Sequence, residues 1–264
     1  MVLDKGGMNM SVLRYFLLVV VFCMTVFAGE VKQKVTIGLG AYFQSQPYKD
    51  VDDIVMPSPV IFFDNGIVYA RWSRFGIYFY GDKAESKNDL SWGFSFTAQP
   101  RVNGYKPDDS SYLIGLDEKK TSMEGGLAFT VQKNGKYLEI MCLGDLFNRY
   151  DSYIVKAETG FEYKFKKLSI YPSLIGVYES KKFTDYYYGI SNNEASRTSY
   201  LPYNPSGGLR VAAQTYLSYP IYKNYSAFFN FRVDRLTNEA KDSPIVDESV
   251  VYSGLASIIY TFSY

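Results

Sequence analysis

Apolar and polar residues alternate along this chain in repeated segments of strand length, each bounded by a turn signal. Side chains of a strand point alternately to its two faces, so each segment has one apolar and one polar face. The pattern predicts an all-β fold, and the lack of a helical period of useful length disfavours α/β folds. The segments are residues 34–43, 55–64, 67–72, 75–80, 90–98, 121–131, 137–147, 153–164, 168–178, 207–219, 225–236 and 249–264.

The lengths of the connections favour a barrel over a sandwich. Connections after odd-numbered segments are mostly long and those after even-numbered segments are short, with Ser73-Arg74 as the exception. A closed barrel in an outer membrane has short periplasmic turns and longer outer loops, whereas a sandwich gives no reason for this parity. Most segments reach the length needed to cross a membrane at a tilt. We expect one closed antiparallel up-and-down transmembrane β-barrel of twelve strands, with ten as the alternative.

The N-terminal residues have the pattern of a secretory signal peptide. Arg14 precedes an apolar run, and Val26-x-Ala28 stands before Gly29. The apolar run is shorter than the roughly 20 residues of a membrane span, which disfavours a retained anchor. We therefore expect export, a signal peptide at residues 1–28 and a barrel domain at residues 29–264.

Composition excludes several function classes. Aromatic residues make up 18% of the chain, which suits two aromatic girdles. Histidine is absent, which excludes Ser-His and Cys-His nucleophilic catalysis and His-ligated metal sites. Without residues 1–28 the chain keeps 26 basic and 26 acidic residues, so charge gives no case for a nucleic-acid partner. The paired carboxylates at residues 52–53, 108–109 and 117–118 fall in predicted loops and are interpreted as solvated. We expect no enzyme activity and no cofactor.

The last segment, SVVYSGLASIIYTFSY, ends the chain on an aromatic residue. Counting back by twos from Tyr264 gives Phe262, Tyr260 and further apolar or small residues on one face. Periodicity alone fits a soluble domain equally well. The segment resembles the closing strand of bacterial outer-membrane barrels, which implies that these three aromatic residues face lipid and form a signal for the barrel-assembly machinery.

Several stretches resemble the MipA/OmpV family of outer-membrane proteins across residues 34–264. They are residues 35–53 (VTIGLGAYFQSQPYKDVDD), 105–115 (YKPDDSSYLIG), 187–191 (YYGIS) and 242–247 (DSPIVD), the last followed by the closing strand. The resemblance implies an outer-membrane scaffold whose partners are a lytic transglycosylase and a bifunctional penicillin-binding protein. Other members of the family are described as porin-like or adhesive, so the resemblance implies location more firmly than task.

Polar residues on the non-lipid faces of the segments are candidates for the barrel lumen. One interpretation is a channel lining whose mixed charge gives little ion preference. The equally weighted alternative is a network of ion pairs and hydrogen bonds that fills a narrow barrel. The candidates are Glu124, Lys156, Glu158, Glu162, Lys164, Arg210, Gln214, Asn230, Arg232 and Asp234.

Three functions remain open from the sequence. The first is a scaffold that contacts murein enzymes through the short turns around Asn134, Lys166 and Asn224. The second is a porin-like channel for small solutes. The third is adhesion through the loops at residues 100–119 and 179–206. The run Tyr186-Tyr187-Tyr188 in the second of these loops suits loop packing or a girdle better than stacking on a ligand.

Overall fold

The computed structural model describes residues 34–84, 86 and 88–263, so the expected signal peptide and Tyr264 lie outside the described residues. These residues form one antiparallel sheet whose strands follow each other in chain order. The strands are β1 (Lys34–Gln44), β2 (Ile54–Asp64), β3 (Val68–Arg71), β4 (Arg74–Asp82), β5 (Ser91–Arg101), β6 (Ser122–Lys133), β7 (Lys136–Asp145), β8 (Tyr153–Phe161), β9 (Tyr163–Phe165), β10 (Leu168–Glu179), β11 (Gly208–Tyr222), β12 (Tyr225–Arg235) and β13 (Val250–Ser263).

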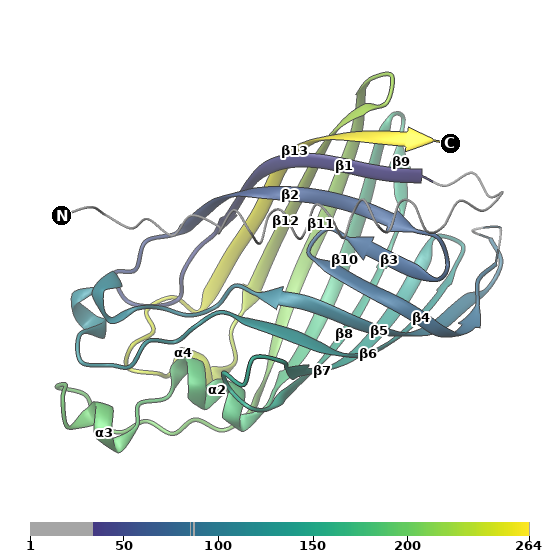
Figure 1. Cartoon of the computed structure of the whole chain (residues 1–264). Coiled ribbons are helices and arrows are strands. Elements are labelled where there is room, and N and C mark those ends of the chain that lie inside the picture. The colour runs from purple at the N-terminus through teal and green to yellow at the C-terminus, as the bar shows by residue number, and fades with distance from the viewer. Residues whose placement is uncertain (1–33, 85, 87, 264) are drawn as a thin grey trace. The chain divides into compact units, whose positions relative to one another are not determined.

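The sheet closes on itself, because the last strand pairs with the first. β13 runs antiparallel to β1 along its whole length, from Lys34 opposite Ser263 to Gln44 opposite Ser253. β8 and β9 pair successively with β10, and together they make one crossing. The barrel thus has twelve crossing strands, which confirms the predicted fold class and strand count. Figure 1 shows β1 and β13 lying side by side at this seam.

Turn chemistry explains the short connections. β6 and β7 are joined by Asn134-Gly135, whose φ angles of 52° and 71° both lie in the left-handed region. A two-residue hairpin turn of this kind follows the twist of the strands and favours the Asn-Gly pair. The start of β1 and the end of β13 lie at the same end of the barrel as this turn. By the loop-length rule this is the periplasmic end, and the long connections form the outer end.

The two faces of the wall differ in polarity, as alternation requires. On β5, Phe94 and Phe96 are exposed on the outer face, whereas Ser95 and Thr97 are buried on the inner face. Unlike in a soluble protein, the exposed large side chains are mostly apolar, and they form the surface that contacts lipid. None of the helices among the described residues is long and apolar enough to span a membrane.

A cap of packed loops closes the outer end. Its helical pieces are η1 (Pro107–Asp109), η2 (Ser111–Leu113), α2 (Lys181–Tyr188), α3 (Asn192–Ala195) and α4 (Asn238–Lys241). In α2, Phe183, Tyr187 and Tyr188 are at most 1% exposed, and they join the largest apolar core of the described residues. Phe183 and Tyr187 are four residues apart and so lie on one helical face, with Tyr188 next to Tyr187, which explains why these rings turn inward together. Loop packing is thus the role of Tyr187 and Tyr188.

Candidate functional site: the cavity of the barrel

A cavity of about 920 Å³ lies inside the barrel beneath the cap. Its lining extends from Thr36 and Asp64, near the periplasmic turns, to Tyr188 and Leu236 under the cap. The volume is at the upper end of the range found for small-molecule sites. The cavity is therefore large enough to hold a ligand as well as water.

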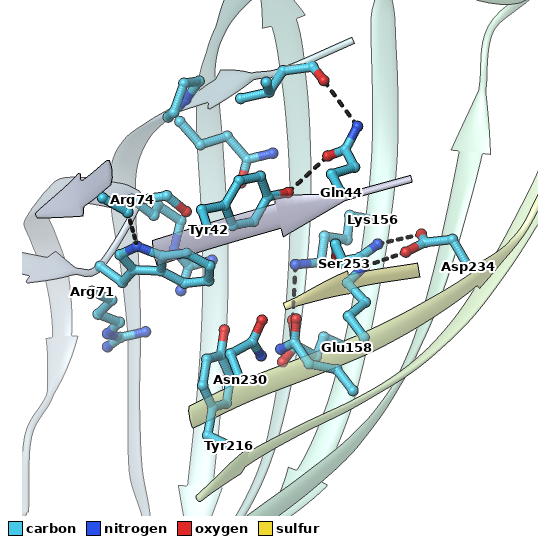
Figure 2. A pocket seen from close by; sticks show the side chains of 18 of the residues that line it. Tyr42, Gln44, Arg71, Arg74, Lys156, Glu158, Tyr216, Asn230, Asp234 and Ser253 are labelled. Carbon is cyan, nitrogen blue, oxygen red and sulfur yellow. Dashed lines mark hydrogen bonds and ion pairs between the residues drawn. The ribbon is translucent and has the colours of Figure 1, made fainter. Parts of the chain in front are cut away.

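One side of the cavity carries charged side chains in ion pairs. Lys156 Nζ lies 2.8 Å from Glu158 Oε2, and the guanidinium of Arg232 binds Asp234 through two contacts of 2.6 Å. These side chains come from β8 and β12, and Figure 2 shows Lys156, Glu158 and Asp234 with their dashed contacts. Each of these two cations is thus paired with a carboxylate from its own strand.

Aromatic side chains line the cavity as well. The rings of Tyr42 and Trp72 lie 5.8 Å apart, and those of Phe62 and Phe228 lie 5.1 Å apart. Trp72 Nε1 donates a 3.1 Å hydrogen bond to Ser58 Oγ, which fixes the indole against the wall. Such rings offer a surface for apolar groups. The cavity is consequently amphipathic, with charged and aromatic side chains in one lining.

The structure brings most of the predicted lumen residues together. Those that line the cavity are Lys156, Glu158, Arg210, Gln214, Asn230, Arg232 and Asp234. Glu124 is fully buried behind the lining. Lys164 is 65% exposed at the periplasmic rim, where it pairs with Glu162 at 3.4 Å, and Glu162 also accepts a bond from Tyr171. Lys164 thus faces bulk water beyond the cavity, since β9 extends past the periplasmic end of the cavity lining.

A buried polar cluster joins the wall to the cap. Glu124 on β6 forms an ion pair with Arg101 on β5, and Gln99 and Tyr150 donate bonds of 2.9 and 3.0 Å to the same carboxylate. The guanidinium of Arg101 lies 4.9 Å from the ring centre of Phe183 in the cap. Both charges are removed from water, so the cluster is stable only while each retains its partner.

Within the cap itself, Glu194 is the central acceptor. Its carboxylate accepts bonds from the backbone of Ser191 at 2.8 Å and of Asp117 at 3.0 Å, and from Lys119 at 3.1 Å. Burial alone raises the pKa of this carboxyl, but the donors outweigh burial and lower the pKa to about 2. Glu194 therefore links α3 to the long loop after β5 as a charged group.

The aromatic residues near the chain end lie at the periplasmic edge of the seam. Tyr260 contacts Tyr225 at a ring distance of 4.8 Å and Phe262 at 4.6 Å, and Phe262 pairs with Val35 of β1. Phe262 is 38% exposed, while Tyr264 lies outside the described residues. Their role as an assembly signal stays a prediction.

Sequence reasoning missed the residues of the β3–β4 hairpin. Arg71, Trp72 and Arg74 all line the cavity, and Arg74 forms an ion pair with the buried Glu139 of β7. The signal lay in the unusually short link after the third segment, because a turn placed below the rim of the barrel brings its own side chains into the lumen. Among the described residues no cluster of three or more Cys, Asp or Glu side chains could hold a metal ion.

A closed twelve-stranded wall with an apolar outer face, short turns at one end and a loop cap at the other defines an outer-membrane β-barrel. Residues 37–262 match the model of the family described as MltA-interacting protein MipA, and the chain belongs to this family. The resemblance seen in the sequence motifs is thereby confirmed, as is the outer-membrane location.

Two relatives from Escherichia coli strain K12 match nearly the whole chain. The MltA-interacting protein is 26% identical over 257 residues, which is 97% of this chain and 100% of the relative. The putative outer membrane protein YiaT is 21% identical over 245 residues, which is 93% of this chain and 98% of the relative.

Solved structures with similar folds are outer-membrane proteins at low similarity. The CymD monoaromatic hydrocarbon channel aligns with a TM-score of 0.40 at 10% identity, covering 89% of this chain and 90% of that chain. OprD from Pseudomonas aeruginosa aligns with a TM-score of 0.37 at 13% identity, covering 90% of this chain and 62% of that chain.

Proposed function

We propose that this protein is a non-enzymatic outer-membrane scaffold that docks a lytic transglycosylase, and with it a penicillin-binding protein, at its periplasmic end. The single observation that carries the proposal is the full-length match to a relative named MltA-interacting protein. The capped outer end is consistent with this task, because the packed loops leave the periplasmic end as the accessible face toward the murein layer.

The periplasmic turns have the chemistry of a docking surface. Lys166 and Lys167 form the turn between β9 and β10 and are both exposed, and Lys223 is exposed in the turn between β11 and β12. Neighbouring turns add Lys133 and Lys136. A ring of lysines on short, rigid turns attracts an acidic partner surface and speeds its association.

Charge reversal at one turn tests the docking surface. We expect the double substitution Lys166→Glu/Lys167→Glu to reduce co-purification of a lytic transglycosylase from envelope extracts several-fold. The matched control is Lys181→Glu/Lys182→Glu, which reverses two adjacent exposed lysines at the outer end. Equal recovery of the enzyme with wild type, the turn variant and a strain lacking the protein would refute the scaffold.

A solute channel is the second candidate, and the cavity favours it. The cavity extends from the periplasmic end to the cap, so only the cap, built around Phe183, Tyr187 and Tyr188, separates it from the outside. We expect refolded protein in planar bilayers to show little conductance and deletion of residues 181–206 to raise it. Large, steady conductance of the intact protein would favour the channel over the scaffold as the main task.

A further inference from the structure

The barrel wall is incomplete between β2 and β5. β3 is short, and β2 pairs with it only from Phe62 to Asp64. β5 pairs with β4 only up to Ala98, although its pairing with β6 continues to Arg101. No described strand pairs with residues 54–60 of β2 or with residues 99–101 of β5 on the sides that face each other. Figure 1 shows β3 as a short arrow beside the longer β2.

This opening, the β2–β5 window, has defined borders. Its lower border is the turn of Trp72 between β3 and β4, where Trp72 N donates to Ile61 O at 2.8 Å. Its upper border is a 3.1 Å hydrogen bond from Gln44 Nε2 to Val102 O. Met56 and Gln99 on the two sides both line the cavity. At about 3.3 Å per residue the unpaired β2 side of the window is roughly 20 Å long.

Two prolines on β2 are placed where the window removes hydrogen-bond partners. In an antiparallel sheet the N–H and C=O groups of one residue point toward the same neighbouring strand, and those of the next residue point toward the strand on the other side. The backbone C=O of Ile61 points toward β3, where it accepts the bond from Trp72 N. Pro57 and Pro59 are two and four residues away, so their backbone groups point to the same side of β2, which is the side of the window. Neither has an N–H group, so of the three residues of this parity in the unpaired stretch only Val55 keeps a donor.

Pro100 does the same on the β5 side. Met123 of β6 accepts a 2.8 Å bond from Leu146 N, so its backbone groups face away from β5. Pro100 is paired with Met123, and paired residues either both face each other or both face away. Pro100 therefore faces the window, again without an N–H group. Both edges of the window are thus adapted to stay unpaired.

The prolines decide between two occupants of the window. A strand from a partner protein adds to a sheet edge through main-chain hydrogen bonds to alternating N–H and C=O groups. The prolines on both edges lack the N–H groups that such a strand would bond to, which disfavours its addition. A hydrocarbon chain needs no donor. The outer surface next to the window is apolar, because Val55 of β2 is 72% exposed and Leu39, opposite Pro59 on β1, is 65% exposed. The medium outside the window is therefore lipid.

The interior continues this apolar route. Trp72 at the lower border contacts Tyr42, and Phe62 with Phe228 follows on the same side of the cavity. The ion pairs Lys156–Glu158 and Arg232–Asp234 line the same cavity, and β12 carries both Phe228 and the Arg232–Asp234 pair. An occupant that suits this mixed lining has a hydrocarbon chain and a polar head.

We propose that a single-chain amphiphile, such as a fatty acid, enters the cavity from the membrane through the β2–β5 window. Its chain lies against Trp72, Tyr42 and Phe62. Its head group reaches the ion pairs Lys156–Glu158 and Arg232–Asp234. This binding activity is independent of docking at the periplasmic turns, so it stands or falls separately from the scaffold.

Tryptophan fluorescence tests the entry directly, because the chain has two tryptophans and one of them borders the window. Trp92→Phe leaves Trp72 as the only emitter. The protein is folded into phosphatidylcholine bilayers and titrated with a fatty acid brominated on its chain, which quenches on contact. We expect saturable quenching of Trp72, well above that produced by chain-brominated phosphatidylcholine at the same bromine content.

Narrowing substitutions identify the route. In the Trp92→Phe background, Ser58→Phe and Met56→Phe each place a ring at the β2 side of the window, and Met56→Phe does so without removing the Ser58–Trp72 hydrogen bond. We expect each to slow the approach to saturated quenching after mixing at least fivefold, because a narrower entry lowers the rates of entry and exit. Ser218→Phe, the matched change in the cavity lining on β11, away from the window, leaves this rate unchanged.

Two outcomes overturn the proposal. Quenching that depends only on bromine content, equal for fatty acid and phospholipid, means that no chain enters the cavity. Saturable quenching whose rate is lowered by neither Ser58→Phe nor Met56→Phe means that the ligand enters by another route, such as the periplasmic mouth.

Discussion

The two ends of this barrel are built on opposite principles. At the outer end the long connections bury apolar residues, with Phe183 and Tyr187 both fully buried in the cap. At the periplasmic end the connections are short, exposed and polar, and a turn such as Asn134-Gly135 is set by backbone geometry alone. Strand pairing thus holds both ends, while the buried apolar side chains of the connections are concentrated in the cap at the outer end.

This difference also separates what each end can do. A cap that shares a core with the wall seals the barrel and moves only at a large cost in buried area. Rigid turns that contribute little to stability can vary in sequence and hold charge for a partner. Docking of a partner is therefore expected at the periplasmic end, and entry of a ligand through the wall between the two ends.

The largest expected effect is at the seam on the periplasmic side. Deleting residues 262–264 removes the pairing of Phe262 with Val35 and the terminal aromatic residue, so the barrel loses the last part of its closure. We expect little protein in the outer membrane and accumulation in the periplasm, measured by fractionation and by heat-modifiable mobility on gels. Phe262→Leu, which keeps an apolar residue, is the control. Normal assembly of the truncated chain would contradict the assembly role.

The next largest effect is expected where wall and cap meet. Glu124→Ala leaves the buried guanidinium of Arg101 without its ion pair, which costs about 3–5 kcal/mol. The matched control Lys164→Ala removes an exposed ion pair with Glu162, for which about 0–1 kcal/mol is expected. Urea unfolding in detergent micelles measures both. Equal losses would show that the cluster beneath the cap carries no special share of the stability.

The wall was predictable from the sequence because its physics is local and repeated. Alternation in segments such as 153–164 and the Asn134-Gly135 turn specify strand faces and hairpins without knowledge of the partner strand. The closure of β13 on β1 was expected from the loop-length parity and from the resemblance of the last segment to closing strands, and not from alternation alone. The placement of Lys156, Glu158 and Arg232 around the cavity follows from strand parity in the same way.

The cap and the window were not predictable, because they depend on contacts between distant segments. α2 shows apolar residues at Phe183 and Tyr187, spaced by four, but a helix of eight residues is marginal until the barrel end packs against it. The prolines at 57 and 59 lie within the segment 55–64 that alternation predicts as a strand. Their use becomes clear only when the unequal lengths of β2 and β3 leave an edge unpaired.

The cap should also respond to pH, through the carboxyl of Glu194. The pKa of Glu194 is about 2 in the folded protein and near 4.5 when unfolded. Its contribution, on the order of 3 kcal/mol at most, is present above pH 4.5 and is lost as the pH falls toward 2. We expect faster hydrogen exchange of residues 180–207 at pH 3 than at pH 6, after correction for intrinsic rates. Glu194→Gln should show fast exchange at both values, and a wild-type cap that is equally protected at both would contradict this role.

The smallest effect is expected at the periplasmic end itself. Gly135 has a φ of 71°, where a Cβ is unfavourable, so Gly135→Ala should cost about 1 kcal/mol. Its Cβ would meet no atom closer than 3.6 Å, so the cost comes from the backbone and not from a clash. Gly176→Ala is the control, because that strand glycine is outside the left-handed region and its nearest neighbour, Leu209, is 3.9 Å from the added carbon. A destabilisation of Gly135→Ala comparable to that of Glu124→Ala would mean that the turn, and not only the cap, holds the barrel together, and the contrast between the two ends would fail.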